Sequence, residues 1–216
     1  MSAHLLLEEL QVDYQIKWFD IKNADDHPDE FKTANPNLTV PAIITADGPI
    51  YESGAILVYL AEKHGSQFMP GIDDSKRGQF WQWQFYLMST LQPEVLNQFH
   101  PERYLPDDPQ GQQKLLASSM LKLEQIWQTI DDRLHSSQHY FCEYYSVCDM
   151  LFAMQALWSE SRPGNLQRYP NILENLDTIY SRPATKTVLR EHGVEYLAHL
   201  IHHQPAKIEL NKEVMQ

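Results

Sequence analysis

The spacing of hydrophobic residues predicts a mixture of helices and strands over the first 65 positions. Ser2–Leu10 has leucines on one face and glutamates 8 and 9 on the other, which is typical of an amphipathic helix. Val12–Ile21 alternates apolar and polar residues and predicts a half-buried strand. Further elements are predicted from the same signals: a short helix or turn around Phe31, strands at Pro41–Thr45 and Pro49–Tyr51 joined at Asp47-Gly48, and a helix from Ser53 to Gly65.

After Gly65 the pattern becomes entirely helical. Residues 66–75 contain proline, glycine and aspartates and indicate a linker. Long helices are expected over Arg77–Phe99, rich in aromatic residues, and over Asp108–Leu134. Shorter helices are expected at Ser146–Ser159, Pro170–Tyr180, Pro183–His192 and Val194–His202. The chain is therefore expected to divide into a small α+β unit (1–65), a linker (66–75) and an all-α unit (76–216).

Composition and charge narrow the class of protein. The 216 residues carry a net charge of −12, which argues against nucleic acids and anionic membranes as partners. The sequence contains no apolar run near the roughly 18 residues of a membrane span and no signal-peptide pattern. Cys142 and Cys148 form neither a CxxC pair nor a zinc spacing, so we expect two reduced thiols in a cytosolic protein.

The stretch NPNLTVPAI contains a proline at the start of a predicted strand. Proline cannot donate a hydrogen bond to a sheet, so Pro41 suits a strand start. A cis Val40-Pro41 bond would turn the preceding backbone outward and offer its N–H and C=O groups to a ligand. The residues alone leave both a plain strand-initiating proline and a cis-proline open.

The stretch YESGAILVYL places Glu52 and Ser53 where a strand ends and a helix begins. Unpaired N–H groups and the partial positive charge at a helix start favour a carboxylate ligand, which the Ser53 hydroxyl could also bind. Glu52 could accept from an ammonium group, so an α-amino-acid end would satisfy both residues. The alternative is that Ser53 merely caps the helix.

Two other patterns have mainly structural interpretations. Ser146 and Asp149 form an S-x-x-D capping box before an apolar run. His199 and His203, four residues apart, could form a metal pair, but no carboxylate completes a zinc signature. A solvated or interface helix is the better interpretation there, and we expect no metal site.

Taken in order, NPNLTVP, DGPIYESGAILVYLAE and YSVCDMLF resemble the glutathione S-transferase family, and HPERY and YPNIL…SRPATKTVL resemble its bacterial members. The resemblance covers nearly the whole chain. It implies a thioredoxin-like N-terminal domain followed by an all-α domain, a cytoplasmic homodimer, and glutathione as substrate. The partner substrate would be a small hydrophobic or electrophilic molecule.

Carried over residue by residue, the resemblance implies a glutathione site. The Val40 backbone would pair with the cysteinyl part, and Pro41 would be the cis-proline that presents it. Glu52 and Ser53 would hold the γ-glutamyl ammonium and carboxylate groups. Trp158 is a candidate wall of the hydrophobic substrate pocket, although an ordinary core aromatic is an equal alternative.

The resemblance fails at the residue that activates the thiol. In the family this residue lies after a first strand that precedes the first helix, and AHLLLEEL resembles that helix itself. The thioredoxin-like domain is therefore expected to be incomplete at its start, by truncation, by rearrangement, or because a partner supplies the strand. Ser2 is the nearest hydroxyl but lies several positions too late. Gln92 stands near the position where some bacterial members carry a histidine.

Two functions follow as expectations. The first is a glutathione transferase that passes glutathione to electrophiles or exchanges it with disulfides, with an unassigned catalytic residue. The second is a noncatalytic protein of the same fold that serves in binding or assembly. The two differ at the activating residue, because a free thiol is only a few per cent thiolate at neutral pH.

Overall fold

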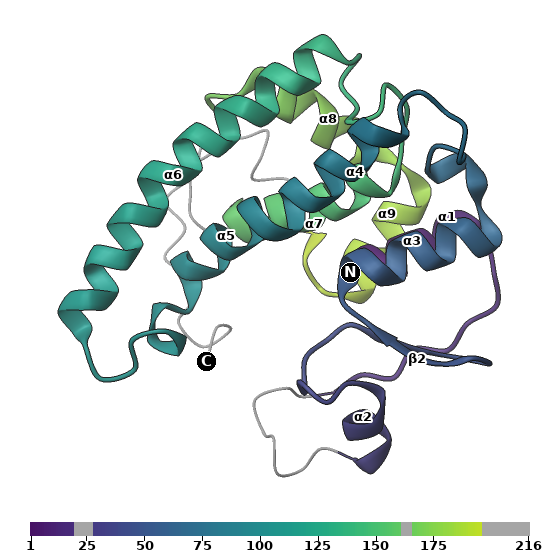
Figure 1. The fold of residues 1–216 in the computed structure, drawn as a ribbon, viewed down its shortest axis with the longest axis horizontal. Helices are drawn as coiled ribbons and strands as arrows, with labels where there is room; N and C mark the ends of the chain where they lie inside the picture. Colours follow the sequence, from purple (N-terminus) through teal and green to yellow (C-terminus); the bar gives the residue numbers. More distant parts are fainter. Residues whose placement is uncertain (20–27, 161–165, 196–216) are drawn as a thin grey trace.

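A computed structural model describes residues 1–19, 28–160 and 166–195. It places a β-hairpin and a short helix on one side of α3 and the longer helices on the other (Figure 1). The helices in chain order are α1 (Ser2–Leu10), α2 (Asp29–Ala34), α3 (Ser53–His64), η2 (Ser66–Phe68), α4 (Arg77–Tyr86), η3 (Leu87–Leu91), α5 (Gln92–Phe99), η4 (Pro101–Arg103), α6 (Pro109–Ser136), α7 (Val147–Glu160), α8 (Pro170–Ser181) and α9 (Pro183–Glu191).

The hairpin predicted around Asp47-Gly48 is confirmed. Strands β1 (Ala42–Thr45) and β2 (Gly48–Tyr51) are antiparallel, with Ala42 opposite Tyr51 and Thr45 opposite Gly48. The Thr45 hydroxyl closes the turn, since it accepts from the Asp47 amide at 3.1 Å and donates to the Gly48 carbonyl at 2.8 Å. Gly48 has φ +118°, a conformation that glycine adopts at little cost.

The strand predicted at Val12–Ile21 is wrong over its described part. Residues 12–19 form no ladder with another described segment, although their burial still alternates. The Tyr14 hydroxyl lies 2.8 Å from His4 Nε2, while Trp18 is 60% exposed and meets the His192 ring edge-on at 4.8 Å. A strand requires a neighbour for its backbone groups, and β1 and β2 pair with each other instead.

The aromatic helix predicted at Arg77–Phe99 is confirmed, with one interruption. The α-helical hydrogen bonding of α4 widens into the π-turn η3 before resuming in α5. Pro93 explains the interruption, because it lacks an N–H and its ring clashes with the carbonyl four residues earlier. The helix predicted from Asp108 is also confirmed, with Asp108 accepting from the Gly111 amide at 2.9 Å.

One hydrophobic core runs through both parts of the described chain. Helix α1 packs against α3, α7 and α9. Leu6, Ile56 and Leu57 are fully buried in the same cluster as Leu87 and Met150. The N-terminal turn of α3 is therefore carried on a helix that is fixed by packing on the helical unit. The domain division at residues 66–75 stays a prediction.

Candidate functional site

The hairpin register brings Val40-Pro41 and Glu52-Ser53 together. Ala42 pairs with Tyr51 at the open end of the hairpin. Pro41 directly precedes Ala42, and Glu52 directly follows Tyr51, so this pairing brings the two segments close to each other. The Val40-Pro41 bond is cis, and Val40 is 52% exposed. The strand end thus offers accessible backbone beside the start of α3.

Asn35, which is not among the site residues expected from the sequence, shapes the loop that leads to Val40. This side chain is buried, with its Nδ2 group donating to the Thr39 carbonyl at 2.8 Å and to the Thr39 hydroxyl at 3.0 Å. Its Oδ1 atom accepts from the Asn37 amide at 3.0 Å. The signal was an asparagine directly after a short helix, a residue that commonly bonds its own backbone two residues on.

The N-terminus of α3 is open. No side chain caps this helix. The alternative in which the Ser53 hydroxyl merely caps the helix is therefore not observed. The first backbone bond of the helix runs from the Ile56 amide to the Glu52 carbonyl, which leaves the amides of Ser53, Gly54 and Ala55 without a partner among the described residues. Such amides bind anions readily.

Glu52 has an unusual backbone conformation for a residue with a side chain. Its φ is +71° and its ψ is 118°. Conformations of this kind cost of order 1–3 kcal/mol and cluster at ligand sites. The Glu52 side chain is exposed, so its carboxylate is accessible beside the free amides of α3. The Glu52 carboxylate can therefore bind a cation, and the adjacent free amides of α3 can bind an anion.

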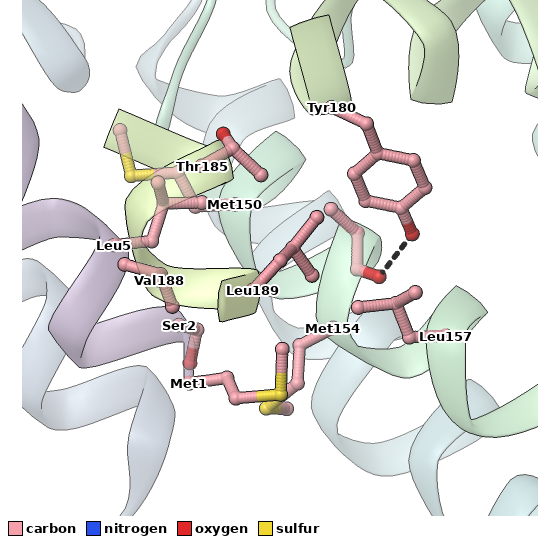
Figure 2. Close-up of a pocket in the computed structure, with 11 residues that line it drawn as sticks. Met1, Ser2, Leu5, Met150, Met154, Leu157, Tyr180, Thr185, Val188 and Leu189 are labelled. Carbon is pink, nitrogen blue, oxygen red and sulfur yellow. Dashed lines mark hydrogen bonds between the residues drawn. The ribbon is translucent and has the colours of Figure 1, made fainter. Parts of the chain in front are cut away.

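A small cavity, lined by none of these residues, lies between α1, α7 and α9 (Figure 2). Its volume of about 20 Å³ holds roughly one water. The Ser2 and Thr185 hydroxyls line it, and both oxygens are buried without a hydrogen-bond partner among the described residues. Met1 occupies the cap position of α1, and Ser2 is the first residue of the helix. With 1% of its surface exposed, Ser2 has no room beside it for a tripeptide thiol.

The capping box encloses a buried carboxylate. Asp149 is fully buried, and its Oδ2 atom accepts from the Ser146 amide at 2.9 Å and the Ser146 hydroxyl at 2.7 Å. Its Oδ1 atom accepts from the Phe141 amide and from Asn175 Nδ2, each at 3.1 Å. Burial raises the pKa of Asp149 to about 6, against the opposing effect of these bonds. No local pattern in the sequence predicts the donors from Phe141 and Asn175.

The remaining candidates are placed as follows. Trp158 is half-buried in α7 against the shared core. Gln92 Oε1 accepts from Gln155 Nε2 at 3.1 Å, and His100 Nδ1 lies 3.0 Å from Glu102 Oε1. The described residues include no group of three or more His, Cys, Asp or Glu suited to a metal. His199 and His203 lie outside the described residues.

Comparison with known proteins identifies the family. Residues 1–63 match the family model for the glutathione S-transferase N-terminal domain. The chain is 31% identical over 193 residues to the disulfide-bond oxidoreductase YfcG of Escherichia coli strain K12, covering 86% of this chain and 87% of that protein. The chain belongs to the glutathione S-transferase family. A glutathione S-transferase domain-containing protein of Dictyostelium discoideum is 30% identical over 197 residues, covering 85% and 74% of the two chains.

Solved structures of the family have the same fold. A sphingomonad glutathione S-transferase complexed with glutathione superposes with a TM-score of 0.76 at 22% identity, covering 89% of this chain and 94% of that one. The transferase from Xylella fastidiosa gives 0.78 at 20% identity, covering 89% and 93%. The predicted thioredoxin-like unit followed by an all-α unit is thus confirmed. No helix among the described residues is long and apolar enough to cross a membrane.

Proposed function

We propose that the chain binds glutathione between Val40-Pro41 and Glu52-Ser53 and uses its thiol to attack electrophiles or disulfides. Membership of the family makes glutathione the thiol substrate. The observation that carries the choice of site is the hairpin register, which sets the accessible Val40 backbone beside the uncapped N-terminus of α3. YfcG is named a disulfide-bond oxidoreductase, which supports exchange with disulfides as one of the two reactions.

Each polar end of the γ-glutamyl group has a complementary partner in this arrangement. The carboxylate would accept from the free amides of α3 and from the Ser53 hydroxyl. The ammonium group would donate to the exposed Glu52 carboxylate, and the cysteinyl backbone would pair with Val40. The bound thiolate would displace a leaving group from carbon, or attack a disulfide sulfur and release the other sulfur as a thiolate.

Replacing Ser53 with alanine is expected to weaken glutathione binding about tenfold, because a hydrogen bond to a charged carboxylate is lost. Isothermal titration calorimetry with reduced glutathione measures the change. Ser66→Ala, at an exposed hydroxyl just beyond α3, is the matched control and should bind like the unmodified protein. Equal affinity in the Ser53→Ala and unmodified proteins would refute the site. Turnover of an activated aryl halide and of a small alkyl disulfide then separates an enzyme from a binding protein.

The co-substrate and compartment complete the proposal. A small hydrophobic electrophile would approach along α7, where Trp158 is half-buried rather than enclosed. A cytoplasmic location is supported by Cys142 and Cys148, which are both buried and remain free thiols. Disulfides are rare in a reducing compartment, so two cysteines that are free thiols in this fold fit that setting.

A homodimer is also part of the proposal, and α4 supplies the apolar surface that supports it. Phe85 is 62% exposed and stacks on Trp81 with ring centroids 5.9 Å apart. We expect light scattering to give twice the 25.2 kDa mass of one chain. Phe85→Glu should shift the protein to monomer, because a charge replaces an apolar contact. Met120→Glu, at another exposed apolar side chain, should leave the dimer intact. If the unmodified protein is a monomer, the proposal is contradicted.

A further inference from the structure

Gln84 connects the first turn of α3 to the helical unit. It lies in α4 with only 3% of its surface exposed. Its Nε2 group donates to the Gly54 carbonyl at 3.3 Å, and its Oε1 atom accepts from the Cys148 thiol at 3.5 Å. Gly54 directly follows Ser53. The buried Gln84 amide of α4 therefore links Cys148 in α7 to the uncapped end of α3.

The hydrogen-bonding partners determine the orientation of the Gln84 amide. The Gly54 carbonyl can only accept, so the nitrogen must face it and the oxygen must face Cys148. Burial raises the pKa of the Cys148 thiol, which keeps it protonated and able to donate. A flipped amide would place two acceptors against each other at Gly54. The Gly54 carbonyl therefore sets the orientation of Gln84, and the Cys148 thiol, which also lies 3.8 Å from the Phe80 carbonyl, complements it.

The bond to Gly54 acts on the ligand side through one peptide unit. The Gly54 carbonyl and the Ala55 N–H belong to the same planar group and point in opposite directions. The Ala55 amide is one of the three that have no partner at the start of α3 among the described residues. A donor held on the carbonyl therefore adds to the helical geometry of α3 in restraining the direction of this N–H, and polarises it toward an anion.

The packing around Gly54 leaves too little space for a side chain unless the neighbouring side chains move. A Cβ atom at this position would lie 3.1 Å from Gln84 Nε2 and 3.2 Å from Met88 Cγ. Such distances are shorter than ordinary contacts, so a methyl group would displace the Gln84 amide. Glycine here permits α4 to approach the ligand-binding turn directly.

We propose that Gln84 is a positioning residue for glutathione, which orients the Ala55 amide toward the γ-glutamyl carboxylate and whose other end contacts the Cys148 thiol. This inference rests on the proposed glutathione site and adds a residue from the helical unit to it. Gln84 does not touch the ligand; it acts through the Gly54–Ala55 peptide. Its effect should therefore depend on the carboxylate that this peptide faces.

The test compares two buried glutamines of the full-length chain by calorimetry with reduced glutathione. Gln84→Met keeps the length of the side chain but removes both hydrogen bonds, and should weaken binding about fivefold. Gln155→Met is the matched control, because Gln155 is also buried and donates to the Leu87 carbonyl at 3.0 Å, away from α3. It should lower the melting temperature by a similar amount while leaving the affinity unchanged.

A second ligand tests the route of the effect. The analogue 4-aminobutyryl-cysteinyl-glycine keeps the ammonium group but lacks the γ-glutamyl carboxylate. The unmodified protein and Gln84→Met should bind this analogue equally. An unchanged affinity for glutathione in folded Gln84→Met overturns the inference, and so does an equal loss in Gln155→Met or for the analogue.

Two further outcomes keep the inference separate from the proposed function. Binding that is weakened by Ser53→Ala but not by Gln84→Met overturns the role of Gln84 alone, whereas absence of glutathione binding by the unmodified protein overturns both. If Gln84→Met does not fold, Gly54→Ala tests the inference instead, because it retains Gln84 but displaces its amide. Weaker glutathione binding by Gly54→Ala supports the inference, and an affinity equal to that of the unmodified protein overturns it.

Discussion

Replacing Asp149 with alanine is expected to lower the free energy of unfolding by about 4 kcal/mol, because several buried donors lose their acceptor together. These donors are the Ser146 amide and hydroxyl, the Phe141 amide and the Asn175 side chain. The carboxylate is fully buried, so water cannot replace it without rearrangement. Urea unfolding followed by circular dichroism measures the loss.

The control for this prediction is Asp132→Ala. Asp132 is an exposed carboxylate on α6 that accepts from Gln128 at 2.9 Å. Its removal should cost less than about 0.5 kcal/mol, as for most surface substitutions. A similar loss in both variants would mean that the Asp149 network contributes no more than a surface charge.

The pH dependence gives a second readout of Asp149. Burial raises the pKa of the folded-state carboxyl from 3.8 to about 6. The folded state then binds a proton more readily than the unfolded state between these values, so the stability from this group is full below about pH 4 and is lost as pH rises through 6. The stability difference between the unmodified protein and Asp149→Ala should therefore widen from pH 7 toward pH 4, and a narrowing difference would contradict the assignment.

Replacing Arg182 with methionine is expected to lower the free energy of unfolding by about 2 kcal/mol. Arg182 Nε and Nη2 donate to the two carboxylate oxygens of Glu9 at 2.5 and 2.8 Å, and the guanidinium lies 4.1 Å from the Tyr145 ring centroid. The Glu9 side chain is only 9% exposed, so it would be left as a buried charge without its partner. The 34% exposure of Arg182 keeps the effect below that of a fully buried pair.

Arg168→Met is the matched control for this pair. Arg168 also bonds a glutamate, Glu124, at 2.9 Å and also lies over a tyrosine ring, at 5.9 Å from Tyr169. Both side chains of the Arg168–Glu124 pair are more than half exposed, so the loss of Arg168 should cost less than about 0.5 kcal/mol. Urea unfolding measures the loss of stability in both variants. Equal losses would contradict the role of the Arg182–Glu9 pair in joining α1 to the turn between α8 and α9.

Parts of the candidate site were predictable because they depend on neighbours in the sequence. Asp47-Gly48 sets the turn, the turn sets the hairpin register, and the register brings Val40-Pro41 to Glu52-Ser53. The open start of α3 and the Ser146–Asp149 box are likewise short-range features. Asn35 could have been added on the same grounds, because its side chain bonds to Asn37 and Thr39, which lie two and four positions along the chain.

The sequence by itself determined the helices, the hairpin and the local chemistry of the ligand turn, because hydrogen bonds between near neighbours and the period of apolar residues encode them. Tertiary structure decided what depends on distant partners. Residues 12–19 form no strand because no described neighbour pairs with them, and Glu9, expected in solvent, is nearly covered in its pair with Arg182. Gln84 reaches Gly54 only because α4 packs there, 30 positions along the chain, and no local pattern specifies such a contact.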